Sequence, residues 1–262
     1  MSLIELEKVI GPLGHQLKNV TLYGTRGEPL LHPKLSEAIH LIKRMSGASI
    51  DVSTNGSLVT AKRSQELLDS GLDRIIFAVD GLSQNTFAAY RVGGRLETVL
   101  TNLKRMCELK AAGDYRTRII LQLIPMATNE AEIPQLPQLA GDLGVDEVRL
   151  KLSSSVSRST IFRPTSDYRS ESNNLGFDCP FGSDKLYVDP NGDCYPCCYG
   201  EGHTRMVLGN AFESSILDIW NSSLTRRIRI PFVEGVGHHS FCIDRCKTRP
   251  PRVKQKLPIL HA

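Results

Sequence analysis

The stretch Tyr-Gly-Thr-Arg-Gly-Glu-Pro-Leu-Leu at residues 23–31, followed by Ser-Thr-Asn-Gly at residues 53–56, decides the fold of this chain. Each stretch follows a short apolar run and precedes apolar residues at helical spacing, so we expect two loops between a strand and a helix. Gly27 lets the backbone turn sharply and approach a ligand closely. Because a residue before proline is disfavoured in a helix, Glu28 is expected to hold its carboxylate at the strand end, where it suits a ligand ammonium group.

The same order of strand, loop and helix recurs along the first part of the chain. We expect its strands at residues 19–23, 49–53, 74–79, 118–124 and 147–152. Strands that alternate with helices predict a parallel sheet with right-handed crossovers. An open doubly wound sheet and a partial barrel both fit this alternation.

Size and composition indicate one large globular domain, or one domain with a small appendage. The chain has 262 residues, 40% of them hydrophobic, and a formal net charge of +4. The sequence has no apolar run long enough to span a bilayer and no charged-then-apolar leader, so we expect a cytoplasmic protein. The basic residues near the end of the chain are more typical of a solvated surface than of a phosphate-binding site.

Cysteine usage predicts a metal site. The sequence has seven cysteines, six of them in the last third: Cys179, Cys194, Cys197, Cys198, Cys242 and Cys246. In a cytoplasmic chain this clustering argues against disulfides. Thiolates bind iron–sulfur clusters and zinc alike, so the residues leave both open. Residues 189–192, Asp-Pro-Asn-Gly, lie between short apolar runs and predict a β-hairpin. Cys107 lies in a helical apolar pattern and is expected to be a buried core thiol.

Three motifs, taken in order, resemble those of a known family. Residues 27–33 (GEPLLHP), 53–56 (STNG) and 77–81 (FAVDG) are similar to motifs of the radical S-adenosylmethionine enzymes. The cysteine-rich frame at residues 179–198 resembles their SPASM or twitch auxiliary-cluster extension.

The resemblance implies an α/β fold with two modules. The first is a partial (β/α) barrel that lacks its first β/α unit, at residues 1–152. A linker or loop at residues 153–178 leads to the second, a small cysteine-rich α+β auxiliary cluster domain at residues 179–262.

The resemblance further implies which residues bind S-adenosylmethionine. The backbone of Gly27 and the carboxylate of Glu28 would hold its amino group. Ser53 and Asn55 would bond its methionine part. Asp80 would face the ribose and carboxylate, and Arg91 would meet the carboxylate. Backbone groups near Asn129 would approach the adenine.

Each of these residues also has a structural interpretation. Glu28 could lie in the first turn of a helix, where the helix dipole favours a carboxylate. Asn55 could form an Asn-Gly turn that satisfies its own backbone. Asp80 could cap the turn before Gly81, and Arg91 could be a surface arginine.

The resemblance also implies the ligands of an auxiliary [4Fe–4S] cluster. They are Cys179, Cys197, Cys242 and Cys246, with Cys198 as the substitute candidate. Cys194 is expected to be a strand residue. A zinc site with the same thiolates is the chemical alternative.

The resemblance also implies a reaction for complete relatives. A second [4Fe–4S] cluster, held by a CxxxCxxC loop, reduces S-adenosylmethionine. The resulting 5′-deoxyadenosyl radical abstracts hydrogen from a peptide, a sugar or an aminocyclitol. Flavodoxin or ferredoxin is the expected electron donor. The CxxxCxxC loop is absent from this sequence. We expect either that the loop precedes Met1 in a longer chain, or that the protein is a catalytically degenerate binding module. A zinc-bearing protein that binds nucleic acid or a partner is a further alternative.

Overall fold

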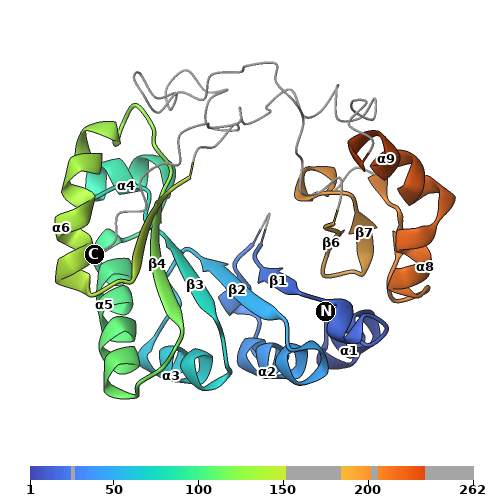
Figure 1. Ribbon diagram of the computed structural model, residues 1–262. Helices are drawn as coiled ribbons and strands as arrows, with labels where there is room; N and C mark the ends of the chain where they lie inside the picture. The colour runs from blue at the N-terminus through green and yellow to red at the C-terminus, as the bar shows by residue number, and fades with distance from the viewer. Residues whose placement is uncertain (25–26, 152–183, 202–205, 234–262) are drawn as a thin grey trace. The chain divides into compact units, whose positions relative to one another are not determined.

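The computed structural model describes residues 1–24, 27–151, 184–201 and 206–233, in two compact units (Figure 1). One unit contains the first strand and most of the residues up to 151. The other contains residues 1–18 and 44–48, together with the described residues from 184 onward.

The larger unit is built on a five-stranded sheet. Its strands are β1 (Asn19–Leu22), β2 (Ser49–Thr54), β3 (Arg74–Ala78), β4 (Arg118–Leu123) and β5 (Glu147–Leu150). They lie in the order β1-β2-β3-β4-β5, and every neighbouring pair is parallel. The predicted parallel α/β sheet is therefore confirmed. A sheet of this order, with a helix between successive strands, is consistent with a partial barrel.

Helices connect the strands and cover one face of the sheet (Figure 1). They are α2 (Leu35–Ser46), α3 (Ala61–Asp69), α4 (Gln84–Tyr90), α5 (Leu96–Ala112) and α6 (Leu136–Leu143), with 3₁₀ turns η2 (Pro29–Leu31) and η3 (Glu130–Gln135). The apolar residues beneath them are fully buried, among them Ile50, Phe77 and Leu121. This core fixes the positions of the strand ends.

The sequence predicts a helix capped by Thr60 and a short helix from Ser83, and local capping places both helices there. The Thr60 hydroxyl accepts from the Arg63 N–H at 3.3 Å and begins α3. Ser83 caps α4 in the same way, by accepting from the Thr86 N–H. Pro137 lies in the first turn of α6, where a helix needs no N–H from its residues, so the proline causes no break.

The smaller unit begins with α1 (Leu3–Ile10), which a capping box between Ser2 and Glu5 initiates. Its sheet has three short antiparallel strands, β6 (Tyr187–Val188), β7 (Asp193–Tyr195) and β8 (Gly209–Asn210). The predicted hairpin is confirmed, and Gly192 takes a left-handed φ of 88° in its turn. This unit also contains two 3₁₀ turns, η1 (Gly14–Gln16) and η5 (Cys198–Gly200).

One sequence expectation is wrong in this unit. The spacing of apolar residues in the sequence predicts one amphipathic helix over residues 214–229, through Ile216, Ile219, Trp220 and Leu224. The chain instead forms α8 (Ile216–Asn221) and α9 (Ser223–Val233). The backbone of Ser222 is extended, with ψ of 154°. Its hydroxyl accepts from the Thr225 N–H at 3.2 Å. Serine competes for backbone bonds in this way and begins a new helix.

Among the described helices, none combines the length and the apolar character needed to cross a membrane.

Gly56 provides a test of the packing between the sheet and α5. Its φ is 78°, and an added Cβ would lie 2.8 Å from side-chain atoms of both Phe77 and Val99. Gly56→Ala is expected to lower the free energy of unfolding by about 1–3 kcal/mol, because the new methyl group is overpacked and strained. Gly141→Ala in α6, where an added Cβ meets nothing within 4 Å, is the control and should be neutral or stabilising. Urea denaturation measures both, and equal effects would contradict this account.

Candidate functional site

The carboxyl ends of parallel strands meet at one edge of a sheet, and four loops gather there. They follow β1, β2, β3 and β4. In open parallel α/β sheets and barrels, ligands bind at this edge. The motifs at residues 27–33, 53–56 and 77–81 lie in these loops or at the ends of the strands before them.

Glu28 connects the first two loops. One carboxylate oxygen, Oε1, accepts from the Thr54 hydroxyl at 2.6 Å and from the Leu30 N–H at 3.2 Å. The other oxygen, Oε2, accepts from the Asn55 N–H at 2.8 Å. Because a carboxylate oxygen accepts two hydrogen bonds, Oε2 retains capacity for one more donor. The carboxylate is thus fixed at the strand end, half-buried, as the sequence predicts.

The glycines of this loop have different roles. A Cβ on Gly24 would lie 2.3 Å from the carbonyl oxygen of Gly27, so residue 24 must be glycine for the loop to close. A Cβ on Gly27 would meet nothing within 4 Å. The backbone of Gly27 therefore borders open space next to Glu28.

Asn55 forms the turn that was the structural alternative for it. Its Oδ1 accepts from the N–H of Ser57 at 2.9 Å and from the Ser57 hydroxyl at 2.6 Å. This is an Asx turn, which orders the loop after β2. Within the described ranges its Nδ2 has no partner. Ser53 is half-buried on β2.

Asp80 lies just beyond β3, is fully buried and forms an ion pair. Its Oδ2 accepts from Arg91 Nε at 2.8 Å and pairs with Arg91 Nη2 at 2.5 Å. Its Oδ1 accepts from the Ile124 N–H at 2.9 Å. An ionised carboxylate without such partners would be costly to bury. The bond from the Ile124 N–H also ties the loop after β3 to the end of β4.

Asn129 completes this connection through its side chain. Its Nδ2 donates to the carbonyl oxygens of Asp80 and Ile124, both at 3.0 Å, and its Oδ1 accepts from the Met126 N–H at 2.7 Å. The side chain is fully buried. The sequence pointed only to backbone groups near this position, so the clamp is an addition from the structure.

Three more residues brace the loops and were not singled out in the sequence. Thr54 holds Glu28, as described above. Glu132 accepts from the Leu82 N–H at 2.7 Å and from the Thr86 hydroxyl at 2.9 Å. Arg63 donates to the carbonyl oxygen of Pro33 at 3.1 Å. In the sequence, the only indication of this role for Glu132 was its position three residues after Asn129.

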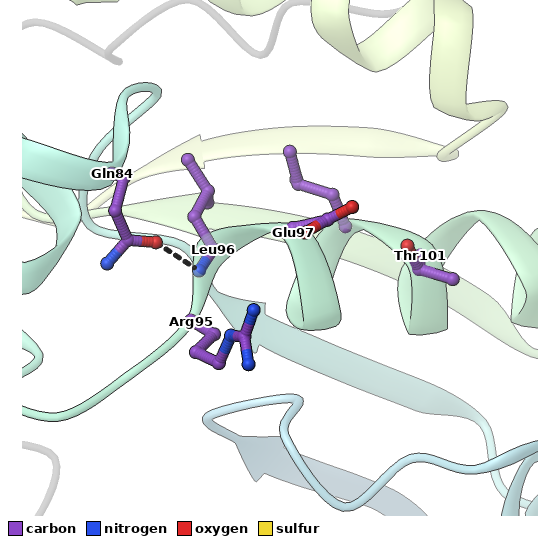
Figure 2. Close-up of a pocket in the computed structure, with 6 residues that line it drawn as sticks. Gln84, Arg95, Leu96, Glu97 and Thr101 are labelled. Carbon is purple, nitrogen blue, oxygen red and sulfur yellow. Dashed lines mark hydrogen bonds between the residues drawn. The ribbon is translucent and has the colours of Figure 1, made fainter.

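A separate hollow of about 660 Å³ lies where α4 leads into α5 (Figure 2). Gln84 accepts there from the Leu96 N–H at 2.9 Å. The hollow is lined by Gln84, Arg95, Leu96, Glu97, Leu100 and Thr101. Most of these residues are exposed, and none belongs to the hydrogen-bonded loops at the strand ends. The loops, with their fixed carboxylate, are therefore the better candidate site.

Of the four predicted cluster ligands, Cys179, Cys242 and Cys246 lie outside the described residues. Cys197 is half-buried immediately before η5, and Cys198 is half-buried at its start. In the described ranges no three His, Cys, Asp or Glu side chains converge on a metal position.

The remaining cysteines are structural. Cys194 is buried in β7, as predicted, and burial raises the pKa of its thiol to about 12. Burial likewise raises the pKa of the Cys107 thiol to about 12, as expected of a core residue. Neither is poised to be a thiolate at neutral pH.

Comparison with protein families gives two matches along the chain. Residues 1–130 match the radical SAM superfamily, and residues 179–248 match the SPASM family, an iron–sulfur cluster-binding domain. The chain belongs to the radical S-adenosylmethionine superfamily. Its second matched region makes it a radical SAM/SPASM iron–sulfur protein, and members of both families bind [4Fe–4S] clusters.

Two curated relatives illustrate the similarity. A tungsten-containing aldehyde ferredoxin oxidoreductase cofactor-modifying protein from Pyrococcus furiosus is 26% identical over 240 residues, 76% of this chain and 66% of that protein. A probable GTP 3′,8-cyclase from Methanococcus maripaludis is 34% identical over 110 residues, 42% of this chain and 36% of the cyclase. The chain thus spans two thirds or less of the length of these relatives.

Solved structures show the same fold. SuiB of Streptococcus suis bound to S-adenosylmethionine superposes with a TM-score of 0.69 at 16% identity, over 87% of this chain and 61% of SuiB. SuiB bound to its precursor peptide SuiA superposes with a TM-score of 0.64 at 16% identity, over 80% of this chain and 56% of SuiB.

The bond between Thr54 and Glu28 can be tested through stability. Thr54→Val keeps the volume of the side chain but leaves Glu28 Oε1 and the Gly56 N–H without their hydroxyl partner. We expect a loss of about 1–3 kcal/mol in the free energy of unfolding. Thr21→Val, on the exposed part of β1, is the control and should change little. A Thr54→Val protein as stable as the control, by urea denaturation, would rule out the connection between the loops.

Proposed function

We propose that this protein binds S-adenosylmethionine at the carboxyl edge of its five-stranded sheet and takes part in radical chemistry on a second substrate. The observation that carries the proposal is the Glu28 carboxylate. It is held by Thr54 and Asn55 at a strand end, next to open space at Gly27.

The residues at this edge fit the ligand. S-adenosylmethionine presents an ammonium group, which needs acceptors, and Glu28 Oε2 has room for one more donor. Gly27 adds a backbone next to which an added Cβ would meet nothing within 4 Å. Asn55 Nδ2 is available to the carboxylate end of the ligand.

The other proposed contacts lie along the same edge. Ser53 is assigned to the methionine part of the ligand. Asp80 and Arg91 are assigned to the ribose and carboxylate side, where the salt bridge between them also positions the loop. Backbone groups near Asn129 are assigned to the adenine, and its buried side chain holds them in place.

We further propose that Cys179, Cys197, Cys242 and Cys246 hold an auxiliary [4Fe–4S] cluster, in a domain at residues 179–262 that a linker at 153–178 joins to the barrel module at 1–152. The match to an iron–sulfur cluster-binding domain supports this. Cys197 is half-buried, whereas Cys194 is buried in β7.

When bound with a reduced catalytic cluster, S-adenosylmethionine supplies a 5′-deoxyadenosyl radical for hydrogen abstraction. The 262 residues contain no CxxxCxxC sequence, so the proposed chemistry needs that cluster to be held by residues beyond them. This chain's own residues bind and orient the ligand. A flavodoxin or ferredoxin would donate electrons, in the cytoplasm, where thiols stay reduced.

The proposed substrate is a peptide or a small molecule such as a sugar or aminocyclitol. A relative that modifies a cofactor, and a structural neighbour solved with a precursor peptide, support these classes.

Binding of S-adenosylmethionine tests the proposal directly. Isothermal titration calorimetry should show that Glu28→Gln lowers the affinity for S-adenosylmethionine at least tenfold, because the amide no longer offers a charged acceptor to the ammonium group. Adenosine, which lacks that group, should bind equally well to both proteins. Glu37→Gln, at an exposed position of α2, is the control. Equal loss for both ligands, or none for either, would contradict the proposal.

Metal analysis after anaerobic purification tests the auxiliary cluster. We expect iron and acid-labile sulfide in about equal amounts, whereas stoichiometric zinc without sulfide would refute the cluster. Cys197→Ser should lower the iron content strongly, and Cys198→Ser should leave it unchanged. The reverse result would move the ligand to the neighbouring cysteine.

A further inference from the structure

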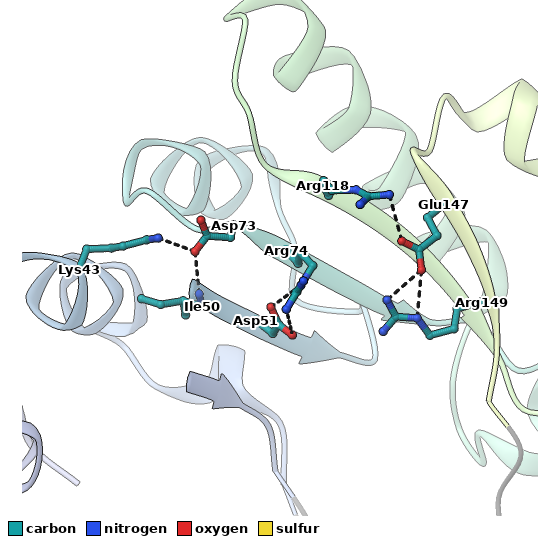
Figure 3. Close-up of polar contacts among 8 residues, drawn as sticks. All are labelled: Lys43, Ile50, Asp51, Asp73, Arg74, Arg118, Glu147 and Arg149. Carbon is teal, nitrogen blue, oxygen red and sulfur yellow. Dashed lines mark hydrogen bonds and ion pairs between the residues drawn. The ribbon is translucent and has the colours of Figure 1, made fainter. Parts of the chain in front are cut away.

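The face of the sheet opposite the helices carries a row of charged side chains (Figure 3). We call it the polar face, and define it by Asp51, Arg74, Arg118, Gln122, Glu147 and Arg149. Asp51 is in register with Arg74, Arg74 with Arg118, and Gln122 with Arg149. Residues in register on parallel strands point to the same side of a sheet, and alternate residues along one strand do the same.

The charges on the polar face do not balance. Asp51 accepts from Arg74 Nε at 2.6 Å and Nη2 at 3.0 Å, so these two compensate each other. Glu147 serves two arginines at once. Its Oε2 accepts from Arg118 at 3.2 Å, and its Oε1 accepts from Arg149 Nε at 3.1 Å and Nη2 at 2.8 Å. The polar face therefore carries one positive charge in excess. Arg149 Nη1 has no partner in the part of the chain that the structure describes.

Gln122 stands beside Arg149 with its amide group unused. The residue is only 6% exposed, and its side chain bonds to no group among the described residues. Its amide keeps some accessible surface, because it is not one of the buried polar groups without a partner, and it can therefore bond a ligand. On its other side, Gln122 is in register with Ala78, a residue with a small side chain.

We propose that Gln122 and Arg149 form a carboxylate-binding subsite for the second substrate. The inference rests on the proposed function and adds the chemical class that the substrate must present. Gln122 Nε2 and Arg149 Nη1 would each donate a hydrogen bond to one carboxylate. The carboxylate balances the excess positive charge and accepts from the amide, and neither a neutral nor a cationic group does both.

The position of the subsite suits a substrate of the reaction. Gln122 lies two residues before Ile124, whose N–H bonds Asp80 at the strand ends. Two residues along a strand span roughly 6.6 Å. A substrate anchored at Gln122 and Arg149 therefore lies one side-chain layer from the proposed S-adenosylmethionine site, with the rest of its length free to extend toward it.

Two sources can supply the carboxylate, an acidic side chain or the C-terminus of a peptide. Three probes separate them: N-acetylglutamate amide presents a side-chain carboxylate, N-acetylglycylglycine presents a terminal one, and N-acetylglutamine amide presents none. Ligand-observed NMR on the chain, without added S-adenosylmethionine, gives an apparent affinity for each probe.

The test uses two variants and a matched control. Arg149→Met and Gln122→Met remove the proposed donors while keeping most of the side-chain volume. Arg118→Met removes the same charge from the same face but leaves the row of Gln122 and Arg149 intact. Melting temperatures confirm that all three variants are folded.

We expect at least one carboxylate probe to bind the unmodified protein, and to bind at least fivefold more weakly to Arg149→Met and to Gln122→Met. Arg118→Met should stay within twofold, and the neutral probe should not bind. The better of the two carboxylate probes identifies the source. Failure of both carboxylate probes to bind, or an equal loss in Arg118→Met, would overturn the subsite.

The probe titrations and the S-adenosylmethionine titration distinguish failure of the subsite from failure of the proposed function. If carboxylate binding follows these variants but Glu28→Gln leaves S-adenosylmethionine binding unchanged, the subsite stands and the proposed reaction fails. If S-adenosylmethionine binding depends on Glu28 but no carboxylate probe binds, the reaction stands and the subsite fails.

Discussion

The arrangement of the loops at the carboxyl edge of the sheet depends on one set of hydrogen bonds, those that the Glu28 carboxylate accepts. A carboxylate that accepts from Thr54, Leu30 and Asn55 fixes two loops relative to each other. Bonds to a charged acceptor are stronger than neutral ones, so a small number of them is enough to order both loops. The sheet sets the distance between the two strand ends, and the Glu28 carboxylate fixes how the two loops lie relative to each other.

A second network does the same for the other half of the edge. Asp80, Arg91 and Asn129 connect the end of β3 to the loop after β4. Both carboxylate oxygens of Asp80 and its carbonyl oxygen are engaged. The two networks together place a fixed anion at one end of the edge and a compensated ion pair at the other. The residues of both networks lie within residues 1–130, which match the radical SAM superfamily.

The sequence predicts those parts of the fold that depend on local patterns. The five strands, the caps at Thr60 and Ser83, and the hairpin with its left-handed Gly192 follow from neighbours a few residues apart. The position of Glu28 was predictable for the same reason, since the following proline restricts its backbone. The family motifs then suggested which of these residues face a ligand.

Long-range side-chain partners were not predictable in this way. Nothing near Asn129 in the sequence indicates that its amide bonds the carbonyl of Asp80, which is 49 residues away. The sharing of Glu147 between Arg118 and Arg149 depends on strand register, which a single sequence does not specify. The break at Ser222 was missed because a strong apolar period concealed a capping serine within it.

The measurement that tests this account most directly is a titration of the isotopically labelled protein with S-adenosylmethionine, followed by backbone amide NMR shifts. The account predicts that the first and largest shifts occur at Gly27, Glu28 and Asn55, on the carboxyl edge of the sheet. Shifts confined to Gln84, Leu96 and Thr101, in the hollow beside α5, would contradict it.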